Sequence, residues 1–182
     1  MPKVNVAVGN ENATGMFFHA PYDPADPADM PTTGAEVLAL VGNDSPWKIA
    51  GVISEDGPTW TPYGSTESIK LWDLSVARMV ETEKGSMSIP VISTDAESMK
   101  TVFGTGAVST TASGFIVNAD DGPRNEQESF VLYGKDGDDD LIWTCVHGMV
   151  TEIAEVGLTP SGALIWSITV TGGWKFIKDT PA

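Results

Sequence analysis

Apolar and polar residues alternate one by one along several segments, and this pattern constrains the fold more than any other feature of the sequence. Within residues 86–91 the apolar positions are Met87, Ile89 and Val91, separated by two serines and a proline. A period of two residues is typical of a β-strand with one buried face. The 19 Gly and 12 Pro indicate many turns. We therefore predict a mainly β chain, a β-sandwich flanked by one short α-helix.

The longest alternating stretch predicts a β-hairpin over residues 74–92, with its turn near residues 83–85. The buried face of the outgoing strand is formed by Leu74, Val76 and Val80. The other face of that strand carries Ser75, Ala77, Met79 and Glu81. On the returning strand, Ser86 and Ser88 lie on the polar face, and Met87 and Ile89 on the buried face. Pro90 has no backbone donor, which predicts that it lies at a sheet edge or a strand end.

One helix is predicted over about residues 94–103. Thr94 and Glu97 have the spacing of a capping box, with Thr94 as the N-cap. Apolar residues follow at helical spacing, and Gly104 suits the C-terminal stop. A helix this short is not stable alone, so we expect it to pack on the sheet.

The remaining chain predicts further strands and a single domain over residues 1–182. Strands are expected near residues 49–53, 69–72, 130–133, 141–147, 149–156 and 163–171, with an acidic turn at 135–140. We expect the sandwich core and its helix to span residues 47–172. An extended arm and loop would precede it over residues 1–46, and a C-terminal tail would follow over residues 173–182.

The charge of the chain excludes several functions. Lys and Arg number 10 against 25 Asp and Glu, which gives a formal net charge of −15. Proteins that bind duplex DNA or anionic membranes need clustered cations, and no such cluster is present in this sequence. The N-terminus lacks the pattern of a secretory signal, so we expect a soluble chain made in a reducing cytoplasm.

Residues 9–33 alternate prolines with aspartates, which disfavours a helix. A segment of this composition has no evident core of its own. Two interpretations remain open for it: a floppy terminus, or an arm that becomes ordered only in an assembly.

Catalysis and metal binding are weakly supported. Cys145 and His147 are two residues apart on a predicted strand, so they share a face but are too far apart for a direct thiol–imidazole pair. A small hydrolase using these two residues is the least favoured hypothesis. The acidic cluster at 136–140 has ligands suited to calcium, but it does not fit the EF-hand pattern, and a solvated turn is favoured. No cofactor is predicted.

Six tryptophans allow another hypothesis, a secreted β-sandwich module that binds carbohydrate. Trp143 and Trp166 lie on alternating strands and are interpreted as core residues. Trp47, Trp60 and Trp174 lie in loop-like or terminal contexts and are candidates for interface anchors.

The order of features carries a resemblance to a known family. Residues 51–57 have the sequence Gly-Val-Ile-Ser-Glu-Asp-Gly, and residues 67–72 have Glu-Ser-Ile-Lys-Leu-Trp. The predicted hairpin and helix follow. This combination resembles the major tail proteins, or tail tube proteins, of long-tailed siphovirus-type phages, especially those of actinobacterial hosts. The likeness is carried by about residues 47–104.

The resemblance implies a virion structural protein that is not an enzyme. Subunits of this family form hexameric rings that stack into a tube, with strands that complete an inner barrel shared by the ring. The implied inner-barrel residues are Ser75, Ala77, Met79, Glu81, Ser86, Met87, Ser88 and Ile89. The implied contacts between rings come from the arm, with the candidates Tyr22, Asp23, Asp26, Asp29 and Trp47. The implied partners are a tape measure protein, tail assembly chaperones and a tail terminator, and DNA passes through the lumen without specific binding.

Overall fold

A computed structural model describes residues 15–42, 45–54, 56–62, 69–70, 76–77, 85–92, 95–118, 126–154, 157–158 and 164–181. Its helices are α1 (Gly34–Leu38) and α2 (Ala96–Phe103), with a 3₁₀ turn at Thr105–Ala107. The first six strands are β1 (Met16–Pro21), β2 (Lys48–Ile53), β3 (Thr59–Thr61), β4 (Ile69–Lys70), β5 (Val76–Ala77) and β6 (Ser86–Ile92). The others are β7 (Val108–Thr111), β8 (Gly114–Val117), β9 (Glu128–Asp136), β10 (Asp139–Ile153), β11 (Gly157–Leu158) and β12 (Leu164–Asp179).

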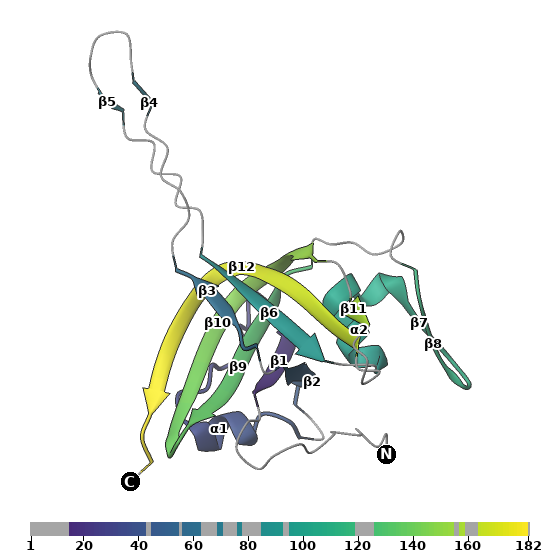
Figure 1. Ribbon diagram of the computed structural model, residues 1–182, viewed down its shortest axis with the longest axis horizontal. Coiled ribbons are helices and arrows are strands. Elements are labelled where there is room, and N and C mark those ends of the chain that lie inside the picture. Colours follow the sequence, from purple (N-terminus) through teal and green to yellow (C-terminus); the bar gives the residue numbers. More distant parts are fainter. Residues whose placement is uncertain are drawn as a thin grey trace.

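The main sheet closes on itself. Its strand order is β11-β12-β10-β9-β1-β2-β6-β3, and an additional β12–β6 ladder joins its two sides (Figure 1). Six strands, β12, β10, β9, β1, β2 and β6, therefore form a closed, barrel-like sheet. The predicted mainly β class is confirmed, and the closed sheet supplies the two facing layers that a sandwich would have.

The barrel interior holds the larger apolar cluster. Met87, Ile89 and Val91 of β6 are buried there, as the alternation predicts. The strands opposite contribute Phe17, Ala50, Phe130, Leu132, Cys145, Ile168 and Val170. Val102 of α2 joins the same cluster, so α2 packs against one end of the barrel (Figure 1). The expectation that a short helix must pack on the sheet is confirmed.

A second apolar cluster covers the outside of β1, β9 and β10. Phe18, Val131 and Ile142 point outward from these strands and meet Val37 of α1 and Trp47. β1 is thus buried on both faces, between β2 and β9. The expectation that residues 9–33 have no core is wrong for residues 16–21, which form an interior strand.

Both helices differ in detail from the prediction. The N-cap of α2 is Asp95, whose side chain accepts a hydrogen bond from the Ser98 amide, so Glu97 does not close a capping box. The predicted N-cap, Thr94, lies outside the described residues. Gly104 ends α2 with a φ of 92°, as expected of a glycine stop. A capping box does occur at Thr33 and Glu36, where it begins α1, the helix that the sequence analysis missed.

The predicted pairing of the 74–92 hairpin is wrong. β6 pairs along one edge with β12, and along the other edge first with β3 and then with β2. Neither edge is open to residues 74–82, and β5 pairs instead with β4 in a separate two-stranded sheet. Pro90 lies between the β3 and β2 ladders, and its carbonyl accepts from the Ser54 amide. The backbone nitrogen of Pro90, which has no hydrogen to donate, therefore lies between two ladders and not at a free sheet edge.

The last third of the chain follows the prediction with longer strands. The acidic turn is confirmed at Gly137, where φ is 62°, between β9 and β10. β10 joins the two strands predicted at 141–147 and 149–156 into one strand that ends at Ile153, with an irregularity between Cys145 and Gly148. β12 continues to Asp179, so residues 173–179, expected to be a tail, extend a strand that pairs with β10.

Candidate assembly surfaces

The residues predicted to form an inner barrel divide between the two faces of β6. Met87 and Ile89 have no exposed surface and lie inside the subunit. Ser86 and Ser88 are half-buried and point the other way. Of the other predicted positions, Ala77 is in β5, while Ser75, Met79 and Glu81 lie outside the described residues. Only the outward face of β6 is therefore available to a neighbouring molecule.

Several strand edges are unpaired in the described part of the chain, and two of them adjoin the ladders of β6. β3 pairs with β6 on one side only. β12 pairs with β6 as far as Thr171, the Gly172 amide then donates to the Gly85 carbonyl, and from residue 173 onward the described ladder partner of β12 is β10. An unpaired strand edge presents backbone donors and acceptors that can bind another strand. The edges of β3 and of residues 173–179 are thus candidate sites for β-pairing between molecules.

The predicted arm residues lie against the barrel and form its surface. The ring of Tyr22 packs on that of His147, with centroids 5.6 Å apart, and its amide bonds to the Gln127 carbonyl. Asp23 accepts from the Ala25 amide at 2.8 Å, which fixes a local turn. Asp23, Asp26 and Asp29 are exposed and line a shallow acidic depression.

Trp47 is a core residue rather than a free interface anchor. Only 4% of its surface is exposed, and it packs in the cluster beneath α1. Trp143 and Trp166 pack against the barrel interior, as predicted, and so does Trp174, one of the expected interface anchors. Trp60, at 38% exposed on the edge strand β3, keeps the surface that an anchor needs.

A polar network holds the C-terminal strands to α1. Asp140 accepts from the Tyr133 hydroxyl at 2.6 Å and pairs with Lys135 at 3.0 Å. These two donors lower the pKa of Asp140, while burial and the bond to Asp140 raise the pKa of Tyr133. Asp179 accepts from the Gly34 amide at 3.0 Å, at the first residue of α1. Asp139 and Asp140 of the acidic turn are therefore engaged by cations and hydroxyls of their own chain.

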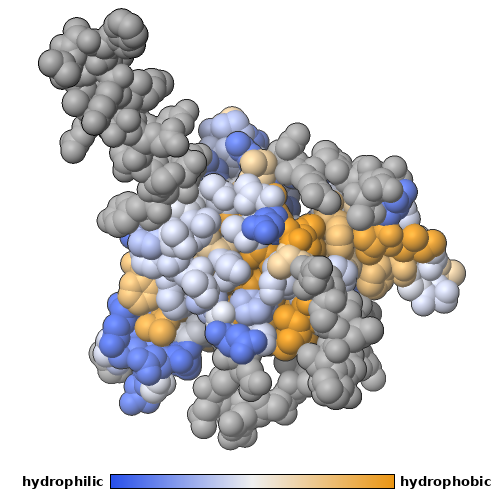
Figure 2. All heavy atoms as spheres, turned by 45° about the horizontal axis from the view of Figure 1, so that its top comes forward, coloured by the Kyte–Doolittle hydropathy of each residue, from blue (hydrophilic) through white to orange (hydrophobic). Residues whose placement is uncertain are grey.

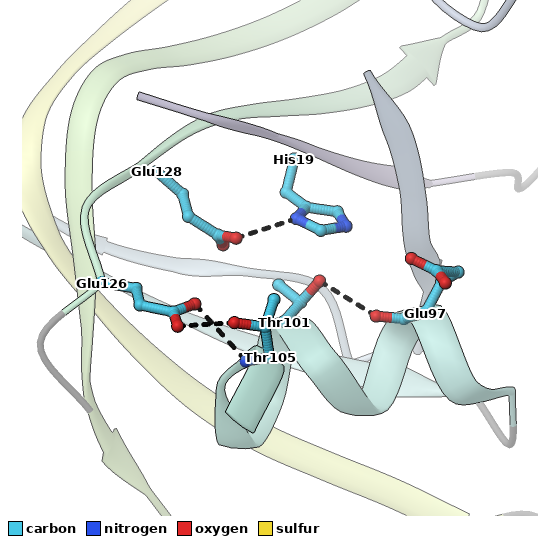
Figure 3. Close-up of polar contacts among 6 residues, drawn as sticks. All are labelled: His19, Glu97, Thr101, Thr105, Glu126 and Glu128. Carbon is cyan, nitrogen blue, oxygen red and sulfur yellow. Dashed lines mark hydrogen bonds and ion pairs between the residues drawn. The ribbon is translucent and has the colours of Figure 1, made fainter. Parts of the chain in front are cut away.

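Three separate polar contacts lie near α2 (Figure 3). The Nδ1 atom of buried His19 lies 3.2 Å from Glu128 of the neighbouring strand, and the Thr105 hydroxyl of the 3₁₀ turn donates to Glu126 at 2.6 Å. The Thr101 hydroxyl donates to the Glu97 carbonyl within the helix. The adjacent cavity is about 20 Å³, room for about one water molecule, so these contacts hold neighbouring segments together and leave no space there for a substrate.

The other candidate chemistry is not assembled in the described residues. Cys145 is fully buried in the barrel interior, and the ring of His147 packs on Tyr22 at a β-bulge. Within the described part of the chain, His, Cys, Asp and Glu side chains form no group of three or more that could hold a metal ion. The described helices are too short or too polar to cross a membrane.

The decisive comparison is with protein families. A model of the phage tail tube protein family matches residues 8–172, a span that includes five of the six barrel strands in full and β12 as far as Gly172. This chain belongs to that family. No curated protein sequence matches it.

Membership makes this tail tube protein a structural component of the phage virion, located in its tail. The family also implies assembly of many copies into a tube. The candidate surfaces are unpaired strand edges and polar contacts that hold elements of the subunit together, which agrees with a structural role. The resemblance drawn from residues 47–104 is confirmed at the level of the family, over a longer stretch than the motifs themselves cover.

Proposed function

We propose that this tail tube protein forms rings, hexameric in the family pattern, and that these rings stack into the conduit through which the genome leaves the capsid. The family match over residues 8–172 carries this proposal. The closed barrel supports it, because a subunit with a complete interior can add to a ring without refolding.

Ring formation would use the edges of β3 and of residues 173–179. The edge of β3 in one subunit and residues 173–179 of β12 in the next would exchange backbone hydrogen bonds, so that these two edges are paired in the ring. If six subunits each contribute four strands at a spacing of ~4.8 Å, the shared barrel has a circumference of about 115 Å and a diameter of about 37 Å. That width makes the barrel a channel rather than a filled core.

The lumen would be lined by small polar side chains and by acids. Ser86 and Ser88 lie on the outward face of β6, and we propose that Ser75, Ala77, Met79 and Glu81 continue this lining. With a net charge of −15, the wall repels phosphates, so DNA passes without being held. The exposed Asp23, Asp26 and Asp29 would take part in contacts between rings.

The further partners follow the family pattern. A tape measure protein would set tube length, tail assembly chaperones would assist assembly in the host cytoplasm, and a terminator would end the tube. The tail would be of the non-contractile siphovirus type, with an actinobacterial host.

Electron microscopy of the purified full chain tests the proposal. We expect six-fold rings or hollow tubes at high protein concentration, alone or with the other tail proteins. A chain that stays monomeric under all these conditions would contradict the proposal. Assembled tubes should also fail to retard duplex DNA on a gel at low salt, and retardation would exclude the repelling lumen.

A carbohydrate-binding module is not favoured by the described tryptophans. Trp47 is buried, and Trp143, Trp166 and Trp174 pack against the barrel interior. Stacking on sugar rings needs an exposed aromatic platform, and among the described tryptophans only Trp60 is more than a third exposed.

A further inference from the structure

The β7–β8 hairpin stands apart from the barrel. It forms its own two-stranded sheet, joined to the body through the end of α2, and it projects from the barrel (Figure 1). At its base Val108 is buried, and the Asn118 amide donates to the Ala107 carbonyl. The hairpin is therefore fixed at its base, while most of its length faces solvent.

The two faces of the hairpin differ. The ladder places Val108, Val117, Phe115 and Thr110 on one face, where the three apolar side chains are buried or half-buried and Thr110 is exposed. Ser109 and Ile116 are paired on the other face, where Ile116 is 61% exposed. Figure 2 shows apolar residues gathered along this projection. The exposed face thus carries a large apolar side chain that its own chain leaves uncovered in the described structure.

The segment lacks the charged residues and prolines that keep an exposed hairpin from pairing with other molecules. Residues 101–119 contain no Asp, Glu, Lys or Arg, and residues 108–117 contain no Pro. Strand segments with this composition pair readily with others, and natural proteins protect exposed edges with charge or proline. A two-stranded hairpin is also marginal in water unless a third strand or a helix packs on it, and α2, which contacts this hairpin, leaves Ser109 and Ile116 exposed. Both facts indicate that another molecule covers the hairpin in the functional state of the protein.

The charge pattern identifies what covers it. Two copies of a chain with a net charge of −15 repel each other, so close contact is favoured where charges are absent. The hairpin is such a place. A basic partner would instead be recognised through acids, and residues 101–119 have none to offer.

We propose that the β7–β8 hairpin docks on a second copy of this chain, with the Ser109–Ile116 face buried in the contact. This inference rests on the proposed assembly into a tube. Subunits would then hold one another in two ways: by pairing of strand edges, and by an apolar contact made by the β7–β8 hairpin. In a closed ring or a stack, the receiving surface is a different part of the neighbour, because such contacts are heterologous.

The test compares two substitutions that remove equally exposed apolar side chains and add the same charge. Ile116→Asp alters the hairpin, while Leu38→Asp alters α1, where Leu38 is 62% exposed. Circular dichroism should show both variants folded, because neither side chain is buried in the subunit. We expect Ile116→Asp to lower the yield of sedimenting tubes at least about tenfold relative to Leu38→Asp, which corresponds to about 1.4 kcal/mol per contact.

A second variant guards against a folding defect in the first. Ser109→Arg replaces one exposed polar residue by another on the same face, and we expect the same loss of tubes. Equal tube yields for Ile116→Asp and Leu38→Asp would overturn the inference and leave the tube proposal intact. Wild-type protein that never assembles would instead overturn the tube proposal, and this inference with it. A photo-crosslinker at position 116 should link two copies in wild-type tubes. A link to a tape measure or terminator protein in its place would overturn the choice of partner.

Discussion

Truncating Met87 tests whether the inward face of β6 belongs to the subunit interior. Met87 has no exposed surface and packs in the barrel cluster, so Met87→Ala leaves a cavity among side chains that cannot all close it. Such substitutions cost about 2–5 kcal/mol. For a domain of this size, that loss lowers Tm by about 5–20 °C in thermal unfolding followed by circular dichroism.

Ser88→Ala is the matched control, because Ser88 is next along the strand and faces outward. We expect its free energy of unfolding to stay within about 0.5 kcal/mol of wild type. At temperatures where Met87→Ala stays folded, it should still form tubes, because the surface is unchanged. An equal loss of Tm in both variants would refute the assignment of faces. A folded Met87→Ala that cannot assemble would show that Met87 contacts a neighbour.

Three further predictions concern the layer around α1 and the exposed tryptophan. Gly34→Ala should lower Tm by an amount equivalent to about 1–3 kcal/mol, because the new Cβ would lie 1.9 Å from the Asp140 carboxylate, whereas Gly42→Ala, with open space around it, should not. The pKa of Asp140 is lowered in the folded state. The ionised carboxylate therefore stabilises the folded protein fully above the unfolded pKa near 3.8, and this stabilisation is lost as the pH falls through the folded pKa. Acid unfolding of Asp140→Asn should lack this part of the pH dependence. Trp47→Ala should cost about 3–5 kcal/mol in denaturant unfolding, while Trp60→Ala should unfold like wild type; the reverse order would restore Trp47 as the interface anchor.

The alternation in the sequence predicted faces correctly but could not predict strand partners. Met87, Ile89 and Val91 are buried as their period requires, because burial of one face depends only on the strand itself. Which strand lies beside β6 depends on the whole topology, and the chain pairs it with β3, β2 and β12 instead of residues 74–82.

β1 was not predicted from the sequence, for a different reason. Phe17 and Phe18 are buried on opposite faces, one in the barrel and one beneath α1, so the strand shows a short apolar run instead of alternation. The prolines and aspartates that follow it suggested an arm. The helix that covers this strand has a visible signal in Thr33 and Glu36, which have the spacing of a capping box. It is the same spacing that predicts a helix start at Thr94 and Glu97.

The internal ion pairs restrict how copies of this acidic chain can hold one another. Lys135 and Lys178 are paired with Asp140 and Asp139 of their own chain, and Lys100 with Glu97. These three cations are already engaged within the subunit, so we expect strand edges and uncharged projections to carry much of the contact between copies. Salt screens the repulsion between exposed charges but has little effect on backbone pairing and apolar burial. Added salt should therefore favour the tube, whereas an interface built on ion pairs would weaken.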